Sequence, residues 1–186
     1  MKTELEILNF LEENYPKCIK NIKIISKDKE NKVSMVDNEE IKFFDFDEEL
    51  LKRVYMGKNT SSLSGVDGLD IKNRTLYFIE FKNGNLKKEK VKIRLKALES
   101  LVGLIKVFQK FSFECDFIDL CLLNKTFILV YNEEKNSANP NSDRLKNLCD
   151  FTDLKEQLEQ YKGNVYKNIY LLTAKQFEEK YLKKYY

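Results

Sequence analysis

Residues 66–84 read VDGLDIKNRTLYFIEFKNG, and this stretch decides which fold the chain can adopt. Two largely apolar segments, 66–71 and 75–82, flank the polar residues at 72–74, which is typical of a β-hairpin. Side chains alternate between the two faces of a strand, so Glu80 and Lys82 are predicted to point the same way. A carboxylate and an amine among apolar residues are costly to bury unless they are solvated or used.

The first strand of this hairpin brings a second carboxylate, whose identity the residues alone leave open. A two-residue turn at 72–73 pairs Asp67 with Phe78 and places Asp67 on the face of Glu80. A three-residue turn places Asp70 on that face instead. Both Asp67 and Asp70 are therefore candidates for the position beside Glu80.

Two carboxylates and a lysine at the end of a hairpin suit metal-dependent chemistry on a phosphate. Asp and Glu oxygens are the protein ligands that Mg²⁺ or Mn²⁺ prefers. The metal lowers the pKa of a bound water and stabilises charge on phosphate. Lys82 would orient or deprotonate that water, or hold the phosphate as a point charge.

Composition excludes several other classes of site. The chain has 186 residues and no histidine, so a Ser-His-Asp triad and a His/Cys zinc site are ruled out. No two of the four cysteines form a CxxC pair; they are Cys18, Cys115, Cys121 and Cys149. Cys115 and Cys121 stand in an apolar run and are predicted to be core thiols.

Charge and hydrophobicity indicate a globular protein with a local binding surface. The 33 basic and 30 acidic residues leave a net charge of +3, so a nucleic-acid site would be a patch and not the whole surface. No segment is apolar enough to cross a bilayer and no signal peptide is visible, so we expect a cytoplasmic protein and no membrane partner.

The order of expected elements predicts an α/β protein whose central mixed sheet is flanked by helices, in one domain over residues 1–186. Helices are expected at 3–14, 45–55, 88–110, 150–161 and from 173 onward. Strands are expected at 22–25, 32–36, 41–44, 66–71, 75–82, 115–123, 126–131 and 168–172, with 115–123 and 126–131 forming a buried hairpin.

The helix at 88–110 carries the clearest helical periodicity in the chain. Its apolar residues recur three and four positions apart, and we expect them to face the core. They are Val91, Leu95, Leu98, Val102, Ile105 and Phe108.

The hairpin and the elements after it resemble the PD-(D/E)xK nuclease superfamily, whose restriction-endonuclease-like core has the order αβββαβ. Val66-Asp67 stands in place of the Pro-Asp element, and Glu80-Phe81-Lys82 matches the ExK element. The string YFIEFKNG followed by KIRLKALESL also resembles a group of small uncharacterised bacterial proteins with this core. The resemblance covers about residues 45–132 and favours Asp67 over Asp70, because it has the usual separation from Glu80.

The resemblance implies that Asp67, Glu80 and Lys82 are catalytic and that Asp67 and Glu80 bind Mg²⁺ or Mn²⁺. Members of the superfamily often place a further carboxylate on an N-terminal helix. Glu48 or Glu49, with Glu12 or Glu13 behind them, are the candidates here, and Asp70 stays open as an additional ligand. For each of these glutamates, a solvated helix face is the competing interpretation.

A basic face follows the ExK strand. Lys88, Lys92 and Lys96 recur every four residues, so they share one side of the predicted helix. Such a face could bind phosphates with a salt-dependent affinity, or it could simply be solvated.

The residues and the resemblance together lead us to expect a metal-dependent nuclease acting on DNA or RNA. The alternative is a nuclease-fold protein without catalysis that acts as an immunity or regulatory partner of another protein. A nucleic acid is the expected partner, and a protein partner or a homodimer stays open.

Overall fold

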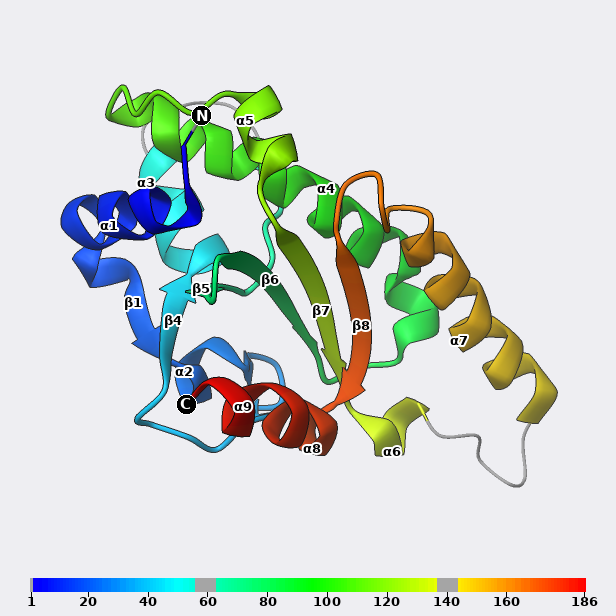
Figure 1. Ribbon diagram of the computed structural model, residues 1–186. Coiled ribbons are helices and arrows are strands. Elements are labelled where there is room, and N and C mark those ends of the chain that lie inside the picture. Colours follow the sequence, from blue (N-terminus) through cyan, green and yellow to red (C-terminus); the bar gives the residue numbers. More distant parts are fainter. Residues whose placement is uncertain (1, 56–62, 137–143) are drawn as a thin grey trace.

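The computed structural model describes residues 2–55, 63–136 and 144–186, and its centre is a six-stranded mixed sheet (Figure 1). Across the sheet the strands follow the order β1-β4-β5-β6-β7-β8. Their bounds are β1 Ile19–Asn21, β4 Lys42–Asp45, β5 Gly68–Lys72, β6 Thr75–Lys82, β7 Lys125–Tyr131 and β8 Asn168–Thr173. Strands β2 Lys27–Asp28 and β3 Val33–Ser34 form a separate small hairpin.

Helices flank both faces of this sheet, which confirms the predicted α/β class. The α-helices are α1 Glu4–Asn14, α2 Ile22–Ile25, α3 Lys52–Tyr55, α4 Leu86–Lys110, α5 Phe117–Leu122, α6 Glu133–Asn136, α7 Arg144–Glu159, α8 Ala174–Phe177 and α9 Lys183–Tyr185. A 3₁₀ turn, η1 Pro16–Cys18, and two π-helical turns, η2 Phe46–Leu51 and η3 Glu178–Leu182, complete the list. No helix in the described ranges is both long and apolar enough to span a bilayer.

The pairing of neighbouring strands changes once across the sheet, from antiparallel to parallel. Neighbours from β1 to β6 are antiparallel, whereas β6, β7 and β8 run parallel. Parallel neighbours need a long crossover, and α4 and α7 supply the two crossovers on the same face of the sheet (Figure 1). Helix α4 therefore lies over the strand that carries Glu80 and Lys82.

Two apolar cores lie on opposite faces of the sheet. The larger core packs α1, η2, α4 and α7 against side chains such as Phe78 and Phe127. The smaller core packs α2, α8 and η3 against Tyr77, Ile79 and neighbouring residues. Side chains alternate between the two faces along a strand, so Glu80 and Lys82 point to the same face as Phe78, which α4 covers.

The β5–β6 hairpin has a two-residue turn, one residue later than predicted. Lys72 pairs with Thr75, so the turn residues are Asn73 and Arg74, both with positive φ. Two such residues in a row are typical of a type I′ turn, which matches the twist of the strands. Phe78 consequently pairs with Leu69 and not with Asp67.

Three expected helices form, and each begins at a capping side chain. The Thr3 side chain accepts a hydrogen bond from the Glu6 backbone, and Thr173 makes the same kind of capping box with Gln176. Asp45 caps η2 by accepting from the Glu48 backbone. The first helix, the helical stretch after Asp45 and the last helix are thus confirmed.

Two segments predicted as strands are helical. Residues 22–25 form α2, because the Asn21 side chain accepts a hydrogen bond from the Ile24 backbone and starts a turn. Residues 117–122 form α5, which Asp116 caps in the same way. The predicted hairpin of 115–123 with 126–131 is therefore wrong, and β7 pairs with β6 and β8 instead.

Helix α4 is confirmed, but only part of its predicted core face packs inward. Phe108 is buried and Ile105 is partly buried, whereas the other four predicted residues are exposed. The side chains facing the sheet include Ile93, Ala97, Ser100 and Leu104, whereas Val91 and Leu95 are exposed. Small residues face inward because the helix lies close to its neighbours: a Cβ added to Gly103 would come within 2.7 Å of a Leu51 methyl group.

One of the two predicted core thiols lies on the surface. Cys115 is buried, but Cys121 is exposed on α5. The prediction for Cys121 is wrong because it assumed a buried strand where the chain forms a short surface helix.

Candidate active site

The carboxylates of Asp67 and Glu80 lie on either side of one ammonium group. Lys96 Nζ, on α4, is 3.3 Å from Asp67 Oδ1 and 2.9 Å from Glu80 Oε2. Lys82 Nζ, on β6, is 3.1 Å from the other oxygen of Glu80. Two carboxylates and two lysines thus meet under α4, at the end of the β5–β6 hairpin.

Glu80 is fully buried, and its environment disfavours its charge. Burial, and next the negative charge of Asp67, raise the pKa of Glu80 to about 7, against the attraction of Lys96 and Lys82. Lys82 approaches Oε1 without hydrogen-bond geometry, and no other donor among the described residues satisfies this oxygen. Glu80 Oε1 is therefore compensated by the charge of Lys82 but has no hydrogen-bond donor.

Lys96 is held as a cation by the same pair. Burial by itself lowers the pKa of a lysine, but the carboxylates of Glu80 and Asp67 outweigh that effect and raise the pKa of Lys96. The ammonium thus partly neutralises two carboxylates that would otherwise repel each other.

Asp67 is positioned by hydrogen bonds on both sides. Its Oδ2 accepts from the Phe81 backbone at 2.7 Å, and its own carbonyl accepts from the Phe46 backbone at 3.0 Å. Gly68 pairs with Ile79, so Asp67, one residue earlier, lies beside Glu80 on the adjacent strand. This explains why the two carboxylates meet.

The segment leading into Asp67 is fixed by three side chains in succession. The backbone N–H groups of Ser64, Gly65 and Val66 donate to Glu99, Asp47 and Ser100, at 2.8, 2.9 and 2.9 Å respectively. Two of these acceptors belong to α4, the helix that also carries Lys96. Helix α4 therefore positions both Lys96 and the backbone segment that leads into Asp67.

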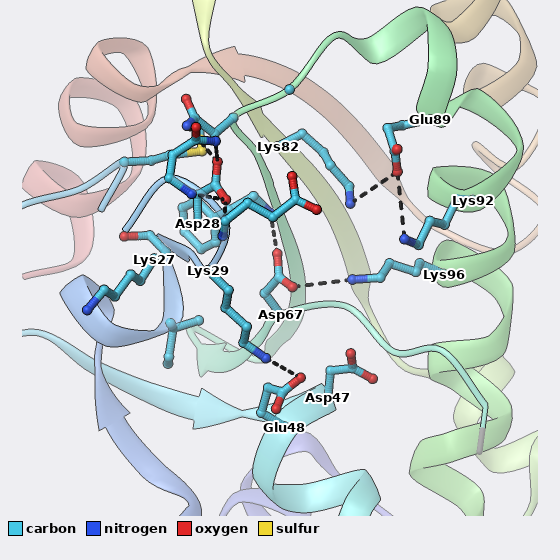
Figure 2. A pocket seen from close by; sticks show the side chains of 18 of the residues that line it. Lys27, Asp28, Lys29, Asp47, Glu48, Asp67, Lys82, Glu89, Lys92 and Lys96 are labelled. Atoms are coloured by element: carbon cyan, nitrogen blue, oxygen red, sulfur yellow. Dashed lines mark hydrogen bonds and ion pairs between the residues drawn. The ribbon is translucent and has the colours of Figure 1, made fainter. Parts of the chain in front are cut away.

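A cavity of about 570 Å³ opens next to this cluster. Asp67, Lys82 and Lys96 line one part of it, and the β2–β3 hairpin lines another (Figure 2). Further charged lining residues are Lys27, Asp28, Lys29, Glu30, Asp45, Asp47, Glu48, Lys88, Glu89 and Lys92. Its volume and mixed charge suit a small polar ligand or a segment of a larger one.

Several of these charged groups are held in place by neighbours. Lys82 is 3.6 Å from Glu89, which in turn is 3.9 Å from Lys92, and Lys29 is 2.5 Å from Glu48 (Figure 2). Burial raises the pKa of Asp45 to about 6 and also raises that of Asp47.

Asp70 lies on the other face of the sheet, away from Glu80. Its Oδ2 accepts hydrogen bonds from the hydroxyls of Tyr181 and Tyr186, both at 2.8 Å. It pairs with Tyr77, whose face packs on the C-terminal helices. Asp70 thus anchors the C-terminus and does not contact the other predicted site residues.

The four glutamates predicted as candidates for a further metal ligand lie in different places. Glu48 lines the cavity, whereas Glu49 pairs with Arg53 at 3.1 Å and with Lys20 at 3.6 Å. Glu12 and Glu13 are exposed on α1 and do not line the cavity. Of the four predicted glutamates, the structure brings only Glu48 to the site.

The three lysines of the predicted basic face have different environments. Lys88 and Lys92 are on the cavity lining, as a phosphate-binding face requires. Lys96 also lines the cavity, but it is largely buried and pairs with both Asp67 and Glu80. The pattern of every fourth residue could not reveal this, because it gives the side of the helix but not its depth.

Sequence reasoning missed Asp47, Ser100 and the β2–β3 hairpin as parts of the site. One signal could have indicated Lys96: it is a single charge next to the small-residue stripe of Ala97, Ser100 and Gly103. A charge beside small residues that face a sheet needs a buried counter-charge.

The donor chemistry fits a divalent cation bound through two carboxylates. Mg²⁺ commonly uses one or two carboxylates and completes its shell with water and phosphate. Glu80 Oε1 and the repulsion between the two carboxylates point to such a cation. No cluster of three or more Asp, Glu, Cys or His suited to a metal occurs among residues 2–55, 63–136 and 144–186, so further ligands would come from solvent or substrate.

No family model, curated protein or solved structure matches this chain.

Proposed function

We propose that this protein hydrolyses phosphodiester bonds in DNA or RNA with a divalent metal ion. The observation that carries the proposal is the pairing of Asp67 with Glu80, beside two lysines, next to a cavity lined by further lysines. Paired carboxylates with nearby amines are suited to phosphate chemistry and need no histidine.

Asp67 and Glu80 would hold Mg²⁺ or Mn²⁺, which when bound supplies an acidified water and positive charge opposite the phosphate. Lys82 contacts the Glu80 carboxylate and lines the cavity, so it can orient the attacking water or hold a phosphate oxygen. Lys88 and Lys92 lie on the cavity wall and would attract the neighbouring phosphates.

Lys96 has a different role in this proposal. Its ammonium contacts both carboxylates, so binding of a dication requires Lys96 to withdraw from at least one of them. The lysine would then lie beside the metal and the phosphate, where its charge still contributes to binding.

The order β4-β5-β6-α4-β7 supports the proposal, because the PD-(D/E)xK resemblance implies three strands, a helix and a further strand in that order. The placement of Asp67 and Glu80 on one face agrees with the same resemblance.

A cleavage assay with Mg²⁺ or Mn²⁺ on duplex DNA, single-stranded DNA and RNA tests the proposal. Glu80→Gln and Lys82→Ala are each expected to lower the cleavage rate by about 100-fold or more. Lys106→Ala is the matched control, because Lys106 is an exposed lysine on α4, and this variant should keep the wild-type cleavage rate. Cleavage that survives both site substitutions would refute the assignment.

A second candidate is a nuclease-fold protein without catalysis that binds another protein. It is favoured by Lys96, which already supplies a cation to the carboxylate pair without any metal. In this case Mn²⁺ would leave thermal stability unchanged, and no substrate in the assay would be cleaved by the wild-type protein.

A further inference from the structure

An apolar stripe runs along the outer side of α4, the long green helix in Figure 1. We call it the α4 seam; it consists of Val91, Leu95, Leu98 and Val102, which are 68%, 48%, 37% and 43% exposed. The side of α4 that packs on the sheet carries a different set, including Ile93, Ala97 and Leu104. The helix is thus apolar on two opposite sides, and the protein's own core uses one of them.

The spacing of the α4 seam is that of a helix pair. Its residues are separated by four, three and four positions, the alternation found at the a and d positions of a heptad. Ile105 continues the alternation by three and is partly buried. A helix that only covers a sheet needs one apolar side, so the second stripe predicts a second helical partner.

We propose that the α4 seam binds the α4 seam of a second copy of this chain, with the two helices antiparallel. In this register Leu95 of each copy packs on Leu98 of the other, and Val91 packs on Val102. The four layers use every residue of the seam, and the arrangement is closed by a two-fold axis.

Charges beside the seam favour this orientation. Lys92 follows Val91 and Glu99 follows Leu98, so both occupy the same heptad position beside the seam. In an antiparallel pair these flanking positions of the two helices lie next to each other, and Lys92 of each copy faces Glu99 of the other. These two residues have opposite charge, and the symmetry makes the pair twice. The side chain of Lys92 is 62% exposed and within reach of a partner.

A parallel pair lacks this advantage. It would bring Arg94 of one copy to Glu99 of the other, but Arg94 lies against α7 and donates to Gln157 at 3.3 Å. Antiparallel packing leaves that contact intact. The inference does not rest on the proposed nuclease activity, because the α4 seam faces away from Glu80.

Sedimentation equilibrium of the full chain tests the proposal. The wild-type protein is expected to be a dimer at about 100 µM, and Leu95→Glu/Leu98→Glu is expected to be a monomer with unchanged circular dichroism. Leu5→Glu is the matched control, since Leu5 is 64% exposed on α1, and it should stay dimeric. A wild-type monomer at this concentration, or a dimer that survives the double substitution, would overturn the proposal.

A charge exchange tests the orientation. Lys92→Glu is expected to weaken the dimer by about tenfold, and Lys92→Glu/Glu99→Lys is expected to restore it, because the exchanged pairs again have opposite charge. Because Glu99 also accepts from the Ser64 backbone, folding of the double variant is checked by thermal unfolding. A folded double variant that dimerises no better than Lys92→Glu contradicts the antiparallel register.

Discussion

The ammonium of Lys96 compensates the negative charge of both carboxylates at the candidate site. It lies within 3.3 Å of both Asp67 and Glu80, and Glu80 has no exposure to solvent. Breaking a buried ion pair by removing one partner commonly costs about 3–5 kcal/mol, since an uncompensated charge remains. If the two carboxylates bind a metal as proposed, the stability of the metal-free protein and its affinity for that metal are linked through this one side chain.

Lys96→Met tests this link, because methionine keeps most of the volume and removes the charge. We expect a free energy of unfolding lower by about 3–5 kcal/mol without metal. Mn²⁺ should then raise the melting temperature of Lys96→Met more than that of wild type, since it replaces the missing cation. Lys106→Met is the control. An Mn²⁺ shift no larger than that of wild type would contradict the account.

Asp45 predicts a pH dependence of stability. Its folded pKa of about 6 is above the value of about 4 in an unfolded chain, so its ionisation opposes folding. The group costs nothing below pH 4, and stability is lost as the pH rises from about 4 to 6.

Asp45→Asn should remove this loss while keeping the helix cap, because asparagine also accepts from the Glu48 backbone. Above pH 6 we expect the variant to be more stable than wild type by about 1–2 kcal/mol, after allowance for solvent screening. At pH 4 the two should coincide in urea denaturation. A difference that is the same at both pH values would show that the charge is not responsible.

At the level of single residues, sequence reasoning reached part of the site. Strand alternation alone places Glu80 and Lys82 on one face, because the period of a strand leaves no freedom. It could not choose between Asp67 and Asp70, since one residue in the turn exchanges them, and the Asn73–Arg74 turn decided this only in the structure. Spacing grouped Lys96 with Lys88 and Lys92, and its burial between the two carboxylates could not be predicted because depth depends on tertiary packing.

The elements show where periodicity fails. The strongest helical pattern in the chain predicted α4 correctly, but of its six apolar residues only Phe108 is buried and Ile105 partly buried. The buried side is marked by Ala97, Ser100 and Gly103, which are small because the helix lies close to η2 and β6. Close approach selects for small side chains, and hydrophobicity alone does not register this.

Gly103→Ala tests the close approach. The added methyl group would lie 2.7 Å from Leu51, whose neighbours Phe46 and Gly65 are also packed tightly. Alanine gains up to about 1 kcal/mol of helix propensity, but overpacking a core costs about 1–3 kcal/mol, so we expect a net destabilisation. Gly84→Ala is the control, since its added methyl group meets no atom within 4 Å. Equal midpoints in urea would contradict this packing.

The short helices α2 and α5 illustrate a second limit. Apolar runs of four to eight residues suit a buried strand or a helix equally well. In both cases a capping side chain, Asn21 or Asp116, selected the helix. For α5, Lys125 adds three hydrogen bonds from Nζ to carbonyls at the end of the helix, at 2.5–3.0 Å.

At the scale of the molecule, the sheet divides the protein into a site face and an anchoring face. Helix α4 lies on one face with Glu80 and Lys82, and on the other the C-terminal tyrosines close over Asp70. The cavity opens between α4 and the β2–β3 hairpin. The class and the central sheet could be predicted because the strong strands and α4 have clear periodicity. Strands β1 and β2 could not, because two or three residues carry no pattern, whereas β3 falls within the strand expected at 32–36.

Tyr181→Phe tests the anchoring face. It removes a buried donor to Asp70 Oδ2, whose carboxylate already has a pKa raised by burial. We expect a loss of about 1–3 kcal/mol in the free energy of unfolding, with no change in metal binding or cleavage. Tyr170→Phe, on an exposed side chain of β8, should be neutral. A loss of activity without a loss of stability would place Asp70 at the site instead.

The proposed function depends on the binding of a divalent cation by Asp67 and Glu80 together. Calorimetric titration of Mn²⁺ into wild type and into Asp67→Asn/Glu80→Gln tests it most directly. The account predicts one site in wild type, with a dissociation constant on the order of 10 µM to 1 mM, and none in the folded double variant. A folded wild-type protein that takes up no Mn²⁺, or a double variant that binds it equally well, would contradict the account.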